Sequence, residues 1–176
     1  MFEFGCGTGR FAERLLAEVL PPSSRYVGVD ISSTMVTLAR ERLRRWPDRA
    51  RVRLSDGSPV LSAADGSFDR VVSNYVLDLL SEDDISTFLA EAARILSEDG
   101  RLCLGSLTHG QGPFPRLVSL AWKQLHALRP QLVGGCRPVR LLDLLPAARW
   151  RIVYREVVSA FGISSEVVVA SRPPLP

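Results

Sequence analysis

The chain has 176 residues, of which 46% are hydrophobic and 23% are charged. This length and composition fit one folded domain with a single core, and they exclude a wholly disordered chain. A formal net charge of +3 does not by itself indicate nucleic acid or a membrane surface as a partner. No apolar run approaches the roughly 18 residues of a membrane span. We therefore expect no membrane span, and we expect no signal peptide.

The three cysteines, Cys6, Cys103 and Cys136, are odd in number and form no C-x-x-C pair. The chain has only two histidines that could join them as metal ligands. We therefore expect reduced thiols, a cytoplasmic location and no bound metal.

The first predicted element is an apolar strand that runs directly into a glycine-rich turn, Met1-Phe2-Glu3-Phe4-Gly5-Cys6-Gly7-Thr8-Gly9. A segment with helical periodicity follows at once, and turns of this kind hold nucleotide-like ligands against a helix N-terminus. The glycines read G-x-G-x-G, and Arg10 stands where a dinucleotide fingerprint requires its third glycine. The carboxylate of Glu3 would repel a pyrophosphate and attract a ligand with a cationic amino group.

Three further strands are predicted over residues 26–30, 52–57 and 68–75. The first of them ends in Asp30, about twenty residues past the glycines, where an acid can accept both hydroxyls of a ribose. The second ends in Asp56. Because the carboxyl ends of parallel strands meet at one edge of an open α/β sheet, these acids are expected to line one crevice.

Predicted helices alternate with the strands, which indicates a parallel sheet with helices on both faces. The first helix follows the glycines and ends at Pro21-Pro22, and the second is capped by Ser32 or Ser33 and runs to about Trp46. A third begins at Ser81 and ends at Asp99-Gly100. The predicted core-facing residues of the first helix are Phe11, Ala12, Leu15, Leu16 and Val19, and those of the third are Ile85, Phe88, Leu89, Ala92 and Leu96.

The last 76 residues predict a fifth strand at 101–107, a loop at 108–113 and an amphipathic helix after it. A loop is predicted at 131–138, a short helix at 141–145, and two final strands at 149–158 and 164–170. The apolar positions of the amphipathic helix are Phe114, Leu117, Val118, Ala121, Trp122 and Leu125.

Four motifs in this order and spacing resemble a class I S-adenosylmethionine-dependent methyltransferase, similar to the small-molecule enzymes around the ubiquinone/menaquinone methyltransferases. The resemblance covers the chain to about Pro173 and implies a Rossmann-like, doubly wound, seven-stranded sheet, mostly parallel with one antiparallel edge strand and helices on both faces. The motifs are Glu3-Phe4-Gly5-Cys6-Gly7-Thr8-Gly9, Gly28-Val29-Asp30-Ile31-Ser32, Ser55-Asp56-Gly57 and Phe68-Asp69-Arg70-Val71-Val72-Ser73-Asn74-Tyr75-Val76.

The resemblance also implies a domain organisation. Residues 1–176 are expected to form a single methyltransferase domain, in which a helical insertion at about 109–147 caps the substrate. Similar enzymes usually carry one or two helices before the first strand, whereas the first strand here begins at Met1. We therefore expect a truncated form, or a homodimer in which a second copy covers the open side of the site.

The resemblance assigns roles to particular residues. The glycines admit the methionine part and the ribose of the cofactor, Glu3 anchors the loop and the amino group, and Asp30 accepts the ribose hydroxyls. Ile31 and Met35 lie against the adenine. The positions implied to bind S-adenosylmethionine, and S-adenosylhomocysteine as product, are Glu3, Gly5, Cys6, Gly7, Thr8, Gly9, Asp30, Ile31, Met35, Asp56, Gly57, Asn74 and Tyr75.

The chemistry expected is methyl transfer to a small, apolar or aromatic acceptor by in-line displacement, in which positioning does most of the catalytic work. His109 is the best candidate for a general base because it follows the fifth strand, and a solvated loop histidine is the simpler interpretation. Tyr75 is the second catalytic candidate, because it could orient an acceptor; simple packing is an equal alternative. Cys6 is interpreted as a small fitting residue rather than a nucleophile.

Two other functions stay open at this point: a protein that binds the cofactor without transferring a methyl group, and a nicotinamide-dependent oxidoreductase, which Arg10 disfavours. A nucleic-acid methyltransferase is disfavoured because residues 73–76 lack an Asp/Asn-Pro-Pro-aromatic pattern. A run of seven arginines could meet phosphate, but a solvated helix face and loop is the preferred interpretation because no aromatic residues interleave it. The run comprises Arg40, Arg42, Arg44, Arg45, Arg49, Arg51 and Arg53.

Overall fold

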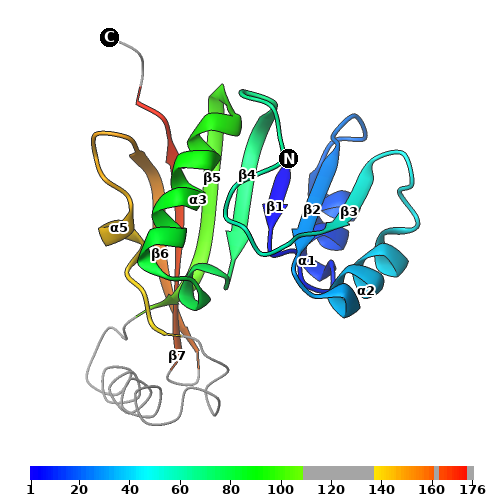
Figure 1. The fold of residues 1–176 in the computed structure, drawn as a ribbon, viewed down its shortest axis with the longest axis horizontal. Coiled ribbons are helices and arrows are strands. Elements are labelled where there is room, and N and C mark those ends of the chain that lie inside the picture. The colour runs from blue at the N-terminus through cyan, green and yellow to red at the C-terminus, as the bar shows by residue number, and fades with distance from the viewer. Residues whose placement is uncertain (109–136, 161–162, 174–176) are drawn as a thin grey trace.

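The computed structural model describes residues 1–108, 137–160 and 163–173. Its centre is a seven-stranded sheet in the order β3-β2-β1-β4-β5-β7-β6 (Figure 1). The first five strands run parallel, while β7 runs antiparallel to both β5 and β6. The seven strands and the antiparallel pairing near one edge are as predicted; the antiparallel strand itself lies one position inside the edge strand β6. The strands are β1 (Phe2–Phe4), β2 (Tyr26–Asp30), β3 (Ala50–Leu54), β4 (Phe68–Asn74), β5 (Leu96–Thr108), β6 (Arg151–Ala160) and β7 (Ile163–Ser171).

One face of the sheet is covered by the helices that follow β1 and β2. These are α1 (Arg10–Arg14), which continues as the π-helix η1 (Leu15–Val19), and α2 (Ser33–Leu43). Their buried residues pack with Tyr26 of β2, Val52 of β3 and Val72 of β4 in one hydrophobic cluster. Because β1 reaches the glycine turn with this cluster behind it, the turn has a rigid support.

The opposite face carries the larger core, which is built around α3 (Glu82–Ile95). Ser81 caps this helix and accepts a hydrogen bond from the Asp84 amide. Three acids in the first turn stabilise the helix through their interaction with the positive end of its dipole. Phe88 of α3 stacks on Phe4 of β1 with ring centroids 4.8 Å apart. In Figure 1, α3 lies in front of β5, and no described helix lies in front of β2 and β3.

Two predicted helices differ from the structure in extent. The third was expected to end at Asp99-Gly100 but ends at Ile95, because residue 96 already pairs with Phe68 of β4. In the first, Ala12 and Leu16 are buried as expected, whereas Phe11 and Val19 are exposed. The π-helical turn, in which the Leu20 amide donates to the Leu15 carbonyl, shifts the helical phase and turns Val19 outward.

The last strands are tied to the sheet by a buried acid. Glu166 of β7 accepts from the backbone amide of Leu141, at the start of the short helix α5 (Leu141–Leu144), at 2.8 Å. The same carboxylate pairs with Arg155 of β6 at 2.7 Å. This pairing satisfies a carboxylate that is only 1% exposed and fixes the predicted short helix against β7.

The predicted amphipathic helix, most of the insertion at about 109–147, and the residues His109, His126 and Cys136 lie outside the described residues. Within the part of the chain that is described, no helix is long and apolar enough to cross a membrane. The same part holds no cluster of three or more histidine, cysteine or carboxylate side chains placed to hold a metal ion.

Candidate functional site

The glycine turn follows β1 and is shaped by backbone that glycine alone adopts easily. Gly5, Gly7 and Gly9 have φ angles of 76°, 52° and 75°. Gly9 is also the N-cap of α1, and a Cβ there would lie 3.1 Å from the Cβ of Ala39 on α2. The third glycine of the motif therefore lets the two helices approach each other beneath the turn.

Backbone and side-chain hydrogen bonds hold the turn against β2. The amides of Gly5 and Cys6 both donate to the Val29 carbonyl at 2.9 Å. The Thr8 carbonyl accepts from the guanidinium of Arg42 on α2. The turn is thereby fixed before any ligand binds, which lowers the ordering cost of binding.

Asp30 connects the turn to the loop after β2. Its Oδ2 accepts from the Gly7 amide at 2.8 Å, and its Oδ1 accepts from the Ser32 amide at 2.9 Å. A carboxylate offers about four lone-pair positions, so each oxygen keeps capacity for a further donor. This geometry suits an acid that takes the two hydroxyls of a ribose while the backbone holds it in place.

A cavity of about 370 Å³ opens at the carboxyl ends of the strands. It joins the glycine turn and Asp30 to residues that lie far apart in the sequence, and its volume falls in the range of small-molecule sites. Of the predicted site residues, the lining includes Gly5, Gly7, Asp30, Ile31, Gly57, Asn74 and Tyr75. The lining residues that were not predicted are Phe4, Val29, Ser55, Val76, Leu79 and Leu80.

Several predicted residues lie outside the lining of this cavity. Cys6 points into the helix-covered core, Asp56 lines a neighbouring cavity, and Met35 is exposed on α2. Thr8 and Gly9 are in the turn but away from the cavity. Burial raises the pKa of the Cys6 thiol to about 12, so the thiol stays protonated, in line with a fitting role rather than a nucleophilic one.

Glu3 lies below the turn and is only 2% exposed. Its Oε2 accepts a hydrogen bond from the Tyr26 hydroxyl at 2.5 Å. Burial raises the pKa of Glu3 to about 7, and the hydrogen bond from Tyr26 partly opposes this rise. Glu3 was predicted to anchor the loop and the amino group of the cofactor; among the described residues, its side-chain hydrogen bond is with Tyr26 of β2.

The sequence carried a signal for the Glu3–Tyr26 pair that was missed. Gly28 stands opposite Glu3 in the β1–β2 register, two residues beyond Tyr26 on the same strand face. A Cβ at Gly28 would lie 2.4 Å from the Tyr26 hydroxyl. Because Gly28 has no side chain, the Tyr26 hydroxyl has room to reach the buried Glu3 opposite it.

Tyr75 follows β4 and is the only described non-glycine residue with a positive φ, at 55°. Its amide donates to the Gly105 carbonyl at 2.8 Å, and its hydroxyl donates to Ser165 Oγ of β7 at 3.0 Å. Such a conformation costs of order 1–3 kcal/mol and persists only where the surroundings hold it. Here, the constraint turns an exposed aromatic ring onto the rim of the cavity.

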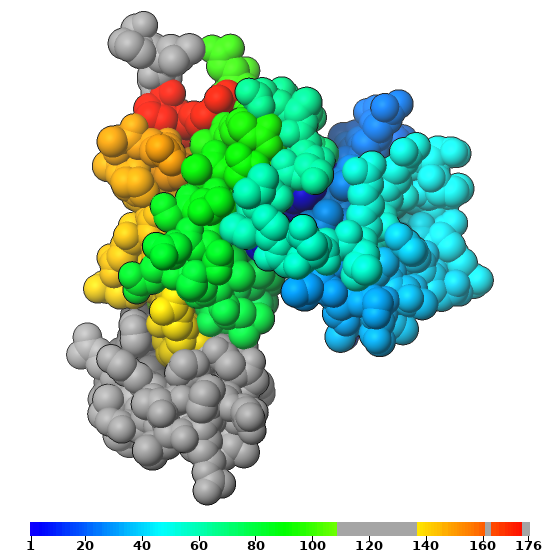
Figure 2. Space-filling view, viewed as in Figure 1, coloured from blue at the N-terminus to red at the C-terminus, as the bar shows by residue number. Residues whose placement is uncertain are grey.

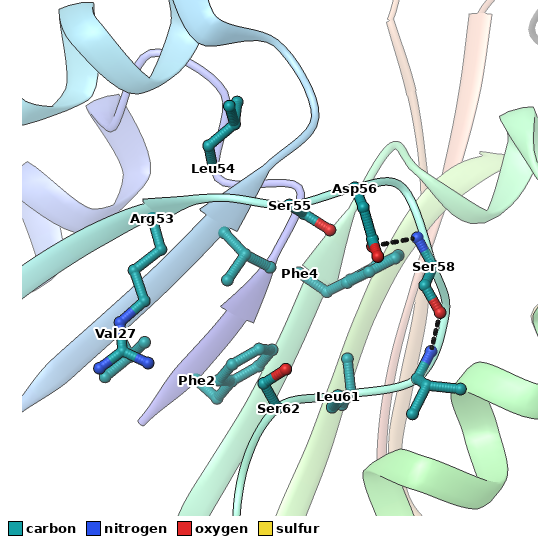
Figure 3. A pocket seen from close by; sticks show the side chains of 12 residues that line it. Phe2, Phe4, Val27, Arg53, Leu54, Ser55, Asp56, Ser58, Leu61 and Ser62 are labelled. Atoms are coloured by element: carbon teal, nitrogen blue, oxygen red, sulfur yellow. Dashed lines mark hydrogen bonds between the residues drawn. The ribbon is translucent and has the colours of Figure 1, made fainter.

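A second cavity of about 390 Å³ lies next to the first and shares Phe4, Val29 and Ser55 with it (Figure 3). Asp56 lies here, where its Oδ1 accepts from the Ser58 amide at 2.9 Å. The two acids at the strand ends, Asp30 and Asp56, thus line adjoining spaces rather than one.

Comparison with known proteins identifies the class. Residues 1–100 match the sequence model of the family described as "Methyltransferase domain". The chain therefore belongs to the methyltransferase domain family, which confirms the resemblance seen in the motifs.

One curated relative is a demethylmenaquinone methyltransferase of Tropheryma whipplei. It is 33% identical over 120 residues, and the match covers 66% of this chain and 46% of the relative. The chain thus spans less than half the length of that relative.

Solved structures confirm the fold over nearly the whole chain. An S-adenosylmethionine-dependent methyltransferase from Methanosarcina mazei superposes with a TM-score of 0.73 at 19% identity, covering 99% of this chain and 92% of that one. The [4+2]-cyclase SpnF superposes with a TM-score of 0.75 at 18% identity, covering 99% and 75%. Since a cyclase shares the fold, the fold alone does not define the reaction.

Proposed function

We propose that the chain is the catalytic domain of an S-adenosylmethionine-dependent methyltransferase acting on a small, apolar or aromatic acceptor. The observation that carries the proposal is the glycine turn, held against Asp30 and opening into a cavity of about 370 Å³. The bound cofactor would supply an already activated methyl group on its sulfonium. Catalysis then depends mainly on how the protein positions the acceptor.

The residues of the cavity fit such a cofactor. Gly5 and Gly7 present the turn's backbone to the cavity, and Asp30 is placed to accept two ribose hydroxyls. Ile31 and Gly57 face each other closely enough that a Cβ at Gly57 would lie 2.7 Å from Ile31 Cδ1. We propose that the adenine lies at this end, where its faces contact apolar side chains.

The other end of the cavity is where we place the acceptor. Asn74 and Tyr75 lie here with the apolar side chains of Val76, Leu79 and Leu80. This mixture suits an apolar or aromatic molecule held by one or two polar contacts. The demethylmenaquinone named for the relative belongs to this chemical class. We propose His109 as a general base and residues 109–147 as a cap over this end.

Acceptor-dependent release of S-adenosylhomocysteine tests the proposed reaction. The unchanged chain and the Asn74→Ala variant are compared at equal concentration. Each is supplied with S-adenosylmethionine and a panel of naphthoquinols, phenols and prenylated aromatics. We expect release with at least one acceptor and a loss of about tenfold or more in kcat/KM for Asn74→Ala, since a polar contact at the reacting end is removed. Cofactor binding with no release for any acceptor would favour the binding protein instead.

Two further proposals concern the setting of this domain. We propose a homodimer that covers the open side of the cofactor cavity, and sedimentation equilibrium showing only monomer would reject it.

We also propose a cytoplasmic location, supported by the free thiols of Cys6 and Cys103; fractionation of the cells that make the protein tests it.

A further inference from the structure

On the face of β1, β2 and β3 opposite α1 and α2, the side chains change from aromatic on β1 to positively charged on β3. In the parallel register, Phe2 lies beside Val27, which lies beside Arg51. One step along, Phe4, Val29 and Arg53 form a second such row. Each row therefore runs from an aromatic ring through a valine to a guanidinium at the edge strand.

This face is open over β2 and β3, whereas Phe2 and Phe4 of β1 are buried. No helix among the described residues packs on the β2 and β3 part of it, and only the loop after β3 crosses it. Figure 2 shows a hollow between the teal surface of the segment after β3 and the blue and cyan surface of β2 and β3. Arg51 and Arg53 are exposed, while Val27 and Val29 are half-buried.

Two adjoining cavities lie on this face and share Val27 and Arg53. The first, of about 390 Å³, has Phe2, Phe4, Val29 and Leu61 as its apolar floor and wall (Figure 3). The second, of about 340 Å³, is lined by Arg25, Arg49, Arg51 and Asp48. An apolar pocket thus leads directly into a cluster of arginines.

The charge of the second cavity favours an anion. Arg49 is already engaged, since it donates to the carbonyls of Ser24 and Pro21. The guanidinium groups of Arg25, Arg51 and Arg53 make no hydrogen bond or ion pair with any other described residue. Asp48 and Asp56 are the carboxylates that line the two cavities, so arginines outnumber acids there.

We propose that this face is a second ligand site, which binds a small amphipathic anion. The apolar body of the ligand lies against the half-buried Val27 and Val29, beside the buried Phe2 and Leu61, and its carboxylate, phosphate or sulfonate is held by Arg51 and Arg53. Guanidinium groups suit such oxyanions because their planar donors match two acceptor oxygens. The site is separate from the glycine turn, and it does not depend on the proposed methyl transfer.

Fluorescence titration with two matched probes tests this site. The anion 8-anilinonaphthalene-1-sulfonate and its uncharged analogue N-phenyl-1-naphthylamine share an aromatic body and differ in the sulfonate. Saturating S-adenosylhomocysteine is present throughout, to occupy the cavity at the glycine turn. The variants are Arg53→Gln, the charge reversal Arg53→Glu, and Arg44→Gln as a control, since Arg44 is an exposed arginine at the end of α2.

The expected result is saturable binding of the anionic probe that weakens about tenfold in Arg53→Gln and further in Arg53→Glu, because a charge-assisted contact is lost. Arg44→Gln should bind as the unchanged protein does, and added salt should weaken binding. Equal affinity for the uncharged probe, equal loss in Arg44→Gln, or no saturable binding would each overturn the proposal.

Discussion

At the scale of single residues, Glu3 gives the sharpest prediction. Its pKa in the folded chain is about 7, above the ordinary value of 4.5, because burial disfavours the carboxylate. Between these two pH values the folded chain holds a proton that the unfolded chain releases, so stability falls as pH rises through this window. Glu3→Gln removes this loss and keeps an acceptor for Tyr26. We expect the variant to gain up to about 3 kcal/mol over the unchanged chain at pH 8.

Urea unfolding of both chains at pH 4, 6 and 8 measures this gain. The difference between them should be small at pH 4 and grow toward pH 8. Glu98→Gln, at an exposed acid of β5, is the matched control and should show no such trend. A difference between Glu3→Gln and the unchanged chain that does not vary with pH would contradict the proposed burial of an ionisable Glu3.

At the scale of elements, the glycine turn depends on the contact between α1 and α2. Gly9→Ala places a Cβ at a φ of 75° and 3.1 Å from Ala39. Gly66→Ala is a matched control, because Gly66 has a φ of 62° but nothing within 4 Å of an added Cβ. We expect the control to lose about 1–2 kcal/mol of stability from backbone strain alone. Gly9→Ala should lose about 1–3 kcal/mol more, measured by the same urea unfolding.

Equal losses in the two glycine variants would show that helix packing does not constrain the turn. A larger loss in Gly9→Ala would instead explain why the spacing G-x-G-x-G serves here without a further glycine at Arg10. In that case, Gly9 is the residue that allows α1 and α2 to approach each other closely.

The elements also show where sequence patterns succeed. Strands β1 to β4 and the cap of α3 follow from apolar runs and capping residues that act locally, and all appear at or near the predicted positions. The end of α3 was misplaced because Asp99-Gly100 is a strong local stop, whereas pairing with β4 is a long-range contact. The exposure of Val19 was missed because periodicity assumes a regular α-helix, and η1 is a π-helix. Phe11 lies in α1, before that turn, and the π-helix does not explain its exposure.

At the scale of the whole molecule, the motifs predicted the sheet and one edge for the site, because parallel strands bring their carboxyl ends together. They did not separate Asp30 from Asp56, which line adjoining cavities. Nor did they reveal the rows from Phe2 to Arg51 and from Phe4 to Arg53, since cross-strand neighbours depend on register. The arginines that looked like a solvated run in the sequence are divided by the fold between α2, the segment after it and the edge strand β3.

The central claim is that the cavity at the glycine turn binds S-adenosylmethionine through Asp30. Calorimetric titration with S-adenosylmethionine and S-adenosylhomocysteine, beside Asp30→Ala and the control Asp69→Ala, tests it most directly. We predict saturable binding of both ligands, retained in Asp69→Ala and weakened at least about tenfold in Asp30→Ala, because two hydroxyl contacts to a charged acceptor are removed. Unchanged affinity in a folded Asp30→Ala chain would contradict the claim.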